Sequence, residues 1–290
     1  MITTLSGRQQ TVQISPDGPT IIIGERINPT GRKRFAEAIV NGQLDVLAAE
    51  AVTQEQQGAH VIDVNVGVGG LDEESVLLEA VKVVAAATGL PLSIDSANPK
   101  AIAAALKVYQ GKALVNSVTG EDKSLDSVLP VVKEYGAAVI GLCHDEWGIP
   151  HDANERLDVA KKIVDRAVSL GIPAEDVILD PLVLTVSAEP EGALITVRTA
   201  ALIREQLGVN MTCGLSNVSY GLPSRPAINN AFIAMCIANG INSMIVNPGA
   251  PNLMETVMAC DVLTARDEYA MRFLKFYRDQ EKKKAAQAQA

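Results

Sequence analysis

The sequence alternates between short apolar runs rich in β-branched residues and longer segments of helical periodicity, and this alternation constrains the fold more than any other feature. The runs are Thr20–Gly24, His60–Val64, Leu92–Ile94, Ala113–Val115, Ala137–Leu142, Val177–Leu179, Met211–Leu215 and Ser243–Val246. Repeated strand and helix units are typical of a parallel sheet. Eight units in about 245 residues predict an α/β fold, a (β/α)8 TIM barrel. A doubly wound sheet is the alternative, although its strands would normally be fewer.

Start signals for helices separate these runs. Asp45, Asp72, Asn98 and Asp152 each precede a segment with helical spacing of apolar residues, and Pro99 follows Asn98. Asp and Asn side chains at such positions accept hydrogen bonds from the free backbone N–H groups of a first helical turn. The pattern therefore predicts a helix after the first, second, third and fifth apolar runs.

The repeat divides the chain into three parts. Residues 1–19 form an N-terminal arm or hairpin, residues 20–265 form the barrel, and residues 266–290 form a C-terminal helix and tail. Gly7 lies between stretches rich in Thr, Val and Ile, which fits a hairpin under the barrel or a loosely held arm. One barrel accounts for the whole repeat, so the sequence predicts no second domain.

Aromatic residues make up only 3% of the chain, and four of them lie near the C-terminus. Tyr269, Phe273, Phe276 and Tyr277 recur at i, i+4, i+7 and i+8, which predicts one helix with one aromatic face. That face packs on the outside of the barrel or forms a subunit interface. We expect the chain to fray from Lys282 onward.

Composition excludes several classes of protein. The net charge of -9, from 34 acidic and 25 basic residues, argues against a nucleic-acid-binding platform. No apolar run approaches the roughly 18 residues of a membrane helix, and no secretory leader is evident, so we expect a soluble, cytoplasmic protein without membrane contact. The four cysteines form no C-x-x-C pair, which indicates neither a disulfide framework nor structural zinc.

Polar residues follow five of the eight runs at the point where each strand should end. They are Asp63, Asp95, Asn116, Asp180 and the pair Ser216 and Asn217. The carboxyl ends of the strands meet at one mouth of a TIM barrel, where its chemistry lies. Each residue alone is more typical of a helix cap or a turn, but the set favours a site.

Carboxylate and amide groups in an apolar cup suit a flat, neutral heterocycle with N–H donors, such as a pterin. A carboxylate accepts two parallel hydrogen bonds from an amidine-like edge. Burying several carboxylates together is costly unless each is hydrogen-bonded or one is protonated. The sequence offers no Cys-His cluster, no H-E-x-x-H pattern and no lysine at a strand end, so metal-assisted hydrolysis and Schiff-base chemistry are poorly supported.

These residues carry a family resemblance that covers Ile21 to Ala265. The strings are IIIGERINPTG, HVIDVNVG, LSIDSANPKAI, ALVNSVTGE, VIGLCHDEWGIP, VILDPLVL, GLSNVSYGLPSRPAINNAFIAM and INSMIVNP. In this order they resemble the pterin-binding methyltransferases that move a methyl group between tetrahydrofolate and the cobalt of a corrinoid protein. The resemblance implies a TIM barrel of the pterin-binding type. Tyr220 departs from the pattern, because some members have Gln there.

The resemblance also implies roles for the residues at the strand ends. Asp95, Asn116 and Asp180 would hold the pterin ring, and Asp63 and Ser216 would belong to the surrounding hydrogen-bond network. Asn217 would reach nitrogen-5 of the folate, which carries the methyl group.

Two residues are expected to be catalytic. The uncharged amide of Asn217 can donate or accept a hydrogen bond as the charge on nitrogen-5 changes. Any proton would move through water held by a carboxyl group such as Asp95. Arg225, which follows the seventh run, is expected to meet the acidic tail of the folate. His144 and Trp147 follow the fifth run, where each is either solvated or in contact with the folate tail or the corrinoid partner.

The sequence therefore predicts a methyltransferase with tetrahydrofolate or 5-methyltetrahydrofolate as substrate, acting from methylcorrinoid to folate. No D-x-H-x-x-G segment for cobalamin occurs, so the cobalamin is expected on a separate corrinoid protein, and the chain is expected to form a homodimer. One alternative is a dihydropteroate synthase-like enzyme, which needs cations for a pyrophosphate at the last strand end, where INSMIVNPGAPN has none. The other is a non-catalytic folate-binding subunit.

Overall fold

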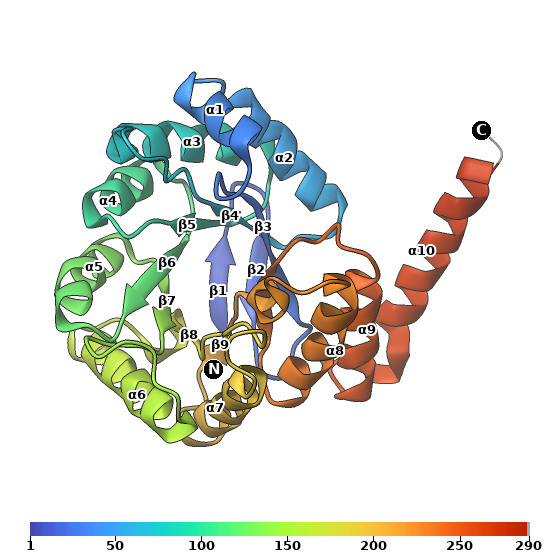
Figure 1. Cartoon of the computed structure of the whole chain (residues 1–290). Coiled ribbons are helices and arrows are strands. Elements are labelled where there is room, and N and C mark those ends of the chain that lie inside the picture. The colour runs from blue at the N-terminus through green and yellow to red at the C-terminus, as the bar shows by residue number, and fades with distance from the viewer. Residues whose placement is uncertain (289–290) are drawn as a thin grey trace.

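The computed structural model describes residues 1–288 of the chain, and it is an eight-stranded parallel barrel surrounded by helices (Figure 1). The strands are β3 (Ile21–Ile27), β4 (Val61–Val64), β5 (Leu92–Asp95), β6 (Leu114–Thr119), β7 (Ala138–Leu142), β8 (Val177–Asp180), β9 (Asn210–Met211) and β10 (Ser243–Val246). They are hydrogen-bonded in the order β10-β3-β4-β5-β6-β7-β8-β9. A parallel bridge between Gly214 and Ile245 joins the two ends of this order and closes the barrel. The predicted TIM barrel is confirmed.

Helices alternate with the strands and cover the outside of the barrel. They are α1 (Lys33–Val40), α2 (Asp45–Gln56), α3 (Glu73–Ala87), α4 (Pro99–Val108), α5 (Asp122–Tyr135), α6 (Ala153–Ser169), α7 (Gly192–Gln206), α8 (Arg225–Ala238) and α9 (Leu253–Leu263). The predicted caps are present at α4 and α6. Asn98 accepts a hydrogen bond from the N–H of Lys100 at 3.0 Å, and Asp152 accepts one from the N–H of Asn154 at 2.8 Å.

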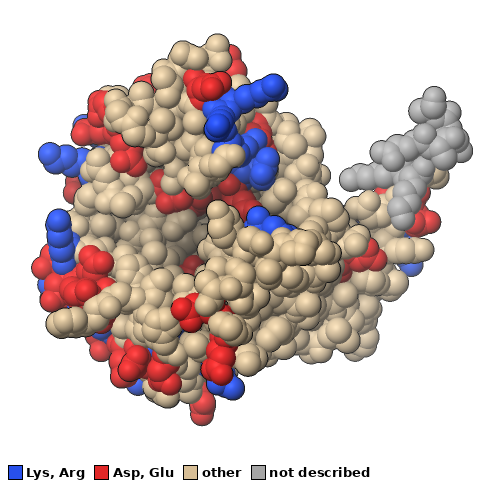
Figure 2. Space-filling view, in the orientation of Figure 1, with Lys and Arg blue, Asp and Glu red and all other residues tan. Residues whose placement is uncertain are grey.

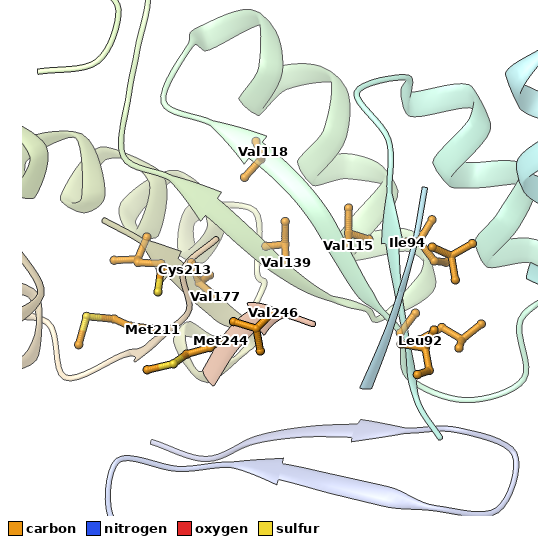
Figure 3. Packing of buried hydrophobic residues seen from close by; sticks show 14 of the residues in the cluster. Leu92, Ile94, Val115, Val118, Val139, Val177, Met211, Cys213, Met244 and Val246 are labelled. Atoms are coloured by element: carbon orange, nitrogen blue, oxygen red, sulfur yellow. The ribbon is translucent and has the colours of Figure 1, made fainter. Parts of the chain in front are cut away.

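The main core lies between the strands and the helices. Leu92, Ile94, Val115 and Val139 from β5, β6 and β7 are completely buried in one cluster with residues of the surrounding helices (Figure 3). Burial of apolar surface of this extent is the dominant stabilising contribution to such a fold. The strands are thereby held in the register that fixes which polar side chains are neighbours at their carboxyl ends.

The seventh strand is shorter than the sequence predicts. The run Met211–Leu215 is extended only over Asn210–Met211, and the chain then turns into a short 3-10 helix, η2 (Leu215–Ser219). The N–H of Asn217 donates to Gly214 O at 3.2 Å, and Arg225 donates to Ser216 O at 2.7 Å. These turn hydrogen bonds take the place of strand pairing.

The first residues form a hairpin that closes the amino-terminal end of the barrel. Strands β1 (Thr3–Ser6) and β2 (Thr11–Ile14) pair antiparallel. Leu5, Val12 and Ile14 are buried in a cluster with residues from inside the barrel, which are Ile21, Ile23, Val61, Leu114, Ala138, Ile140 and Ile178. The hairpin therefore fills the barrel from the end opposite to the mouth.

Polar contacts fix the hairpin in this place. The Nδ2 atom of Asn210 donates to Thr3 Oγ1 at 2.8 Å and to Ile14 O at 2.9 Å. Gly7 lies against the backbone of Leu90, where a Cβ atom would stand 2.3 Å from the carbonyl oxygen. Only glycine fits this close approach, because no side chain can displace a backbone carbonyl.

The C-terminal region differs from the predicted aromatic helix. Tyr269 lies in the 3-10 turn η3 (Glu268–Ala270) with a φ of 54°, so it is not part of the helix that holds Phe273. Helix α10 (Met271–Ala288) begins after this turn, where Asp267 accepts hydrogen bonds from the N–H groups of Arg272 and Phe273. The helix continues beyond Lys282, where fraying was expected; residues 289–290 lie outside the described part.

Helix α10 projects away from the barrel (Figure 1). The buried carboxylate of Asp261 fixes the start of this helix, because it accepts hydrogen bonds from Thr20 Oγ1 at 2.6 Å and from Arg272 Nη1 at 3.1 Å.

Burial and the nearby positive charge of Arg272 lower the pKa of His60 to about 4 at this end of the barrel. Within residues 1–288, no helix is long and apolar enough to cross a membrane.

The packing of the hairpin gives a prediction about stability. Leu5→Ala should lower the free energy of unfolding by about 2–5 kcal/mol, because it leaves a cavity inside the barrel. Urea unfolding measures this loss. The matched control is Ile2→Ala, since Ile2 is 52% exposed and its truncation should cost less than about 0.5 kcal/mol. Equal losses in the two variants would contradict the role of the hairpin as part of the core.

Candidate functional site

The carboxyl ends of the strands surround a hollow at the centre of the barrel (Figure 2). Acidic side chains lie in and around this hollow. Asp95 and Asp180 are the last residues of β5 and β8, Asp63 is the last but one of β4, and Asn116 lies in the middle of β6. The strand-end residues that the sequence singles out therefore surround one mouth.

Asp63 and Asp95 are joined in one hydrogen-bonded group. Asp63 Oδ1 accepts hydrogen bonds from Ser93 Oγ at 2.6 Å and from Asn116 Nδ2 at 3.1 Å. Asn65 Nδ2 donates to Asp95 Oδ2 at 2.9 Å, and a further hydrogen bond links the two carboxyl groups. Every member comes from β4, β5 or β6, or from the residue directly after β4.

This pair of carboxyl groups holds a proton. Burial raises the pKa of Asp63 well above its usual value, and the charge of Asp95 raises it further. Burial also raises the pKa of Asp95. Two buried carboxyl groups in contact cannot both ionise at low cost, so one proton is shared between them. Asp63 is the more deeply buried of the two, and burial and the charge of Asp95 both raise its pKa, so Asp63 binds a proton more readily than an exposed aspartate.

Glu25 on β3 forms a second polar group with Ser216 and Arg225. Ser216 Oγ donates to Glu25 Oε1 at 3.2 Å. Burial raises the pKa of Glu25, while this hydrogen bond and the charges of Arg26 and Arg225 oppose the rise. The charge of Glu25 in turn raises the pKa of Asp63, so the two groups act on each other.

Asp180 occupies a third position at the mouth. Its Oδ1 accepts a hydrogen bond from the N–H of Leu182 at 2.8 Å, and the N–H of Gly214 donates to the same carboxyl group. Burial is the largest effect and raises the pKa of Asp180 to about 6, although these N–H groups and Arg156 oppose it. Asp180 is therefore poised between its charged and neutral forms near neutral pH.

Asn217 lies on η2, exposed to solvent at the mouth. Among the described residues, none forms a hydrogen bond with its side-chain amide, although its backbone N–H and C=O are bound within the turn. Arg225 holds the same turn through Ser216 O at 2.7 Å and Ser219 Oγ at 3.0 Å. The guanidinium of Arg225 thus supports the turn that presents Asn217.

Sequence reasoning missed three members of the site. Glu25 stands in the string GERIN, within the first strand, and is not among the residues singled out at the strand ends. Asn65 and Ser93 are the donors that make the burial of two carboxyl groups tolerable. The signal for Glu25 was present, because an acidic residue near the end of a buried strand follows the same rule as Asp95.

A cavity of about 650 Å³ opens beside the first carboxyl pair. Its lining includes Asp95, Asn98, Asn116 and Lys123, from the ends of β5 and β6 and the starts of α4 and α5. This volume lies in the usual range of sites for small molecules and cofactors. In residues 1–288, no group of three His, Cys, Asp or Glu side chains has the arrangement of a metal site.

The barrel and its mouth define a TIM-barrel enzyme with a polar site at the carboxyl ends of the strands. The chain belongs to the pterin-binding enzymes, because residues 24–247 match the family described as "Pterin binding enzyme". This match runs from within β3 to just past the end of β10, and it includes the carboxyl pair, Asn116, Asp180 and Asn217.

Two named relatives resemble the chain in sequence. It is 29% identical to the methylcorrinoid:tetrahydrofolate methyltransferase of Eubacterium limosum, and the similarity covers 89% of this chain and 96% of that protein. It is 28% identical to the methionine synthase of Mycobacterium tuberculosis over 84% of this chain, which corresponds to only 22% of that protein.

Solved structures of dihydropteroate synthases share the fold. The enzyme of Xanthomonas albilineans with 4-aminobenzoic acid superimposes with a TM-score of 0.70 at 18% identity, covering 91% of this chain and 99% of that one. The Yersinia pestis enzyme with a pterine-sulfa conjugate gives 0.68 at 17% identity, covering 91% and 99%. At this identity the likeness concerns the fold alone.

The raised pKa of Asp180 predicts a dependence of stability on pH. The group titrates near 3.8 when unperturbed and at about 6 in the fold, so the folded state binds more protons between these values. Its contribution to the free energy of unfolding is therefore present below about pH 4 and is lost as pH rises through 6. Relative to the parent, Asp180→Asn should gain about 2 kcal/mol in free energy of unfolding from pH 4.5 to 7.

Urea unfolding of both proteins across this range measures the gain. The other titrating groups cancel in the comparison, and Asp158→Asn is the matched control because Asp158 is exposed on α6. Parallel pH profiles for the parent and Asp180→Asn would show that Asp180 has an ordinary pKa.

Proposed function

We propose that this protein transfers a methyl group from the cobalt of a separate corrinoid protein to nitrogen-5 of tetrahydrofolate. The observation that carries this proposal is the similarity to the Eubacterium limosum methyltransferase over nearly the full length of both proteins. The family match and the methionine synthase relative support a pterin substrate and a corrinoid partner.

The mouth offers the groups that such a substrate needs. Asp95, Asn116 and Asp180 would bind the pterin ring at its edge, with Asp63 in the network behind them. A pterin donates N–H hydrogen bonds from adjacent positions, and a carboxylate accepts them in parallel. Burial and the charge of Asp95 favour a proton on Asp63, so Asp95 would be the better acceptor for the pterin edge.

The reaction forms one bond and breaks one. The lone pair of nitrogen-5 attacks the methyl carbon on Co(III), a new N–C bond forms, and the Co–C bond breaks with both electrons left on cobalt as Co(I). Nitrogen-5 then loses its proton, which a carboxyl group at the mouth receives through water. We assign this acceptor role to Asp95.

Asn217 would position nitrogen-5 for the attack. Its amide is free of hydrogen bonds from the described residues and lies on a turn held by Arg225. An amide both donates and accepts, so it can remain bonded to nitrogen-5 before and after the methyl group arrives. Ser216 and Arg225 would act by fixing this turn, and Arg225 would also meet the acidic folate tail.

Methyl transfer is tested directly by spectroscopy. Methylcobalamin or a methylated corrinoid protein is mixed with tetrahydrofolate and the enzyme, and the absorbance change from methyl-Co(III) to Co(I) is followed under anaerobic conditions. Tight binding of tetrahydrofolate without this change would favour the folate-binding subunit. Condensation of a pterin pyrophosphate with 4-aminobenzoate would favour the synthase alternative, although residues 247–252 after β10 contain no cation for the pyrophosphate.

Asn217→Ala should lower kcat on the order of 100-fold, because it removes a hydrogen bond needed in the transition state. The dissociation constant for tetrahydrofolate, measured by calorimetry, should change less than about threefold, since the carboxyl groups bind the ring. Asn239→Ala, at the far end of α8, is the control and should keep the parental kcat. Unchanged kcat in Asn217→Ala would remove Asn217 from the mechanism.

We also propose a cytoplasmic homodimer joined through α10. The four cysteines are free and buried, as in proteins of reducing compartments. Met271, Leu274 and Tyr277 on α10 are exposed, and the helix leaves the barrel, so a second copy would cover these side chains.

Sedimentation tests the homodimer. Tyr277→Asp should convert the dimer to a monomer, because the charge would be buried at the interface. Val40→Asp, on the exposed end of α1, is the control and should leave the dimer intact. A parent protein that sediments as a monomer at micromolar concentration would contradict the homodimer.

A further inference from the structure

Exposed apolar side chains occur in the segments that follow β7, β8 and β9, three neighbouring strands of the barrel. Trp147 and Ile149 lie in the loop between β7 and α6, Leu194 lies near the start of α7, and Tyr220 follows η2. Trp147 is 94% exposed and Tyr220 is 68% exposed. We call these four residues the rim patch. Trp and Tyr are enriched where protein surfaces meet, because each combines a large apolar ring with one polar atom.

The loop that carries Trp147 is a tight turn bound to its neighbours. The N–H of Gly148 donates to Asp145 O at 3.0 Å, and the N–H of Trp147 donates to Asp145 Oδ1 at 3.0 Å. Glu146 Oε1 accepts a hydrogen bond from the N–H of Asp122 at 2.5 Å, which links the turn to α5. These hydrogen bonds fix the backbone at Trp147. Little backbone freedom would therefore be lost when a partner binds.

A buried arginine joins this loop to the next one. The guanidinium of Arg156 is completely buried and donates to Pro150 O at 2.8 Å, Pro181 O at 2.6 Å and Leu182 O at 2.7 Å. Pro150 belongs to the loop after β7, whereas Pro181 and Leu182 follow β8. One side chain thus fixes the relative positions of two loops of the rim.

The loop after β8 is bound in turn to the segment that carries Asn217. Thr185 Oγ1 donates to Tyr220 O at 2.8 Å, and the N–H of Val186 donates to Val218 O at 3.0 Å. The three loops after β7, β8 and β9 are therefore one connected unit. This unit carries the rim patch and also Asn217.

Acidic residues are frequent in the segments that carry the rim patch, on the loops after β7 and β8 and in the first half of α6. They are Asp145, Glu146, Asp152, Glu155, Asp158, Glu189 and Glu191, and Figure 2 shows acidic groups along the side of the barrel where α5, α6 and α7 lie. Lys162, among the nearby basic residues, is already paired with Asp122 at 3.1 Å and Glu146 at 3.5 Å. The patch is thus apolar at its centre and negative at its edge.

We propose that the rim patch is the docking surface for the corrinoid protein, through a partner surface that is apolar and flanked by Lys and Arg. This inference rests on the proposed function, which requires the cobalt to reach nitrogen-5 beside Asn217 and so requires its carrier to cover the mouth. Tetrahydrofolate would bind in the hollow, whereas Trp147 is 94% exposed in the loop that follows β7. A second copy of this chain, with a net charge of -9, would bring acidic residues against acidic residues.

The test compares two methyl donors with the full-length enzyme. The donors are free methylcobalamin and the corrinoid proteins of the same genome, each loaded with methylcobalamin. Trp147→Ala should raise KM for the matching corrinoid protein on the order of tenfold, because exposed aromatic anchors dominate such interfaces. Its kcat/KM with free methylcobalamin should stay within twofold of the parent. Since Trp147 is the only tryptophan, its fluorescence should fall when the corrinoid protein binds, and more weakly at high salt.

Val168→Ala is the matched control, because Val168 is an exposed apolar residue at the other end of α6 and should leave both donors unaffected. The inference is overturned if Trp147→Ala and the double variant with Ile149→Ala keep KM for every corrinoid protein within twofold. It is also overturned if Trp147→Ala changes the sedimentation of the enzyme alone, since the patch would then belong to a second copy. Failure of the parent with both donors would instead reject the proposed methyl transfer.

Discussion

The site depends on removing two neighbouring carboxyl groups from water. An isolated buried carboxylate costs several kcal/mol, so Asp63 and Asp95 need hydrogen-bond donors and a shared proton. The strand order supplies the donors: the register places Ser93 of β5 opposite Asp63, Asn116 of β6 also donates to Asp63, and Asn65 after β4 donates to Asp95. The packing of β4, β5 and β6 therefore determines both the barrel and the protonation of its mouth. A shift of one residue in either register would separate each carboxyl group from its partner.

The opposite side of the mouth is built from loops rather than strands. Arg225 and Arg156 use their guanidinium groups to bind backbone carbonyls, which fixes the chain where no sheet pairing is available. This gives the exposed Asn217 a defined position without hydrogen-bonding its amide. The amide of Asn217 is therefore held by a rigid loop but is free to form hydrogen bonds. This suits a group that must contact a substrate bound at the strand ends while a partner protein approaches from solvent.

The positions of the site residues at the barrel mouth were predictable because strand ends converge at one face of a TIM barrel. Asp95, Asn116 and Asp180 could be predicted from the position at which each apolar run ends and from the polar residue that follows it. Glu25 was missed because β3 extends two residues beyond it, so it lies within the strand and not at its end. Tyr269 was assigned to the aromatic helix because residue spacing alone does not reveal its left-handed φ, which separates η3 from α10.

The sequence by itself determined the barrel, the mouth at which its polar residues lie and the type of ligand that those residues suit. These follow from local periodicity and from the residue type at each strand end, which act over a few positions of the chain. The tertiary structure decided which of the carboxyl groups of Asp63 and Asp95 binds a proton more readily and which turn Arg225 binds. It also decided how the loop of Trp147 is joined to the turn of Asn217. Such properties depend on burial and on contacts between residues far apart in the chain, because desolvation and hydrogen-bond geometry exist only after the strands and loops have packed.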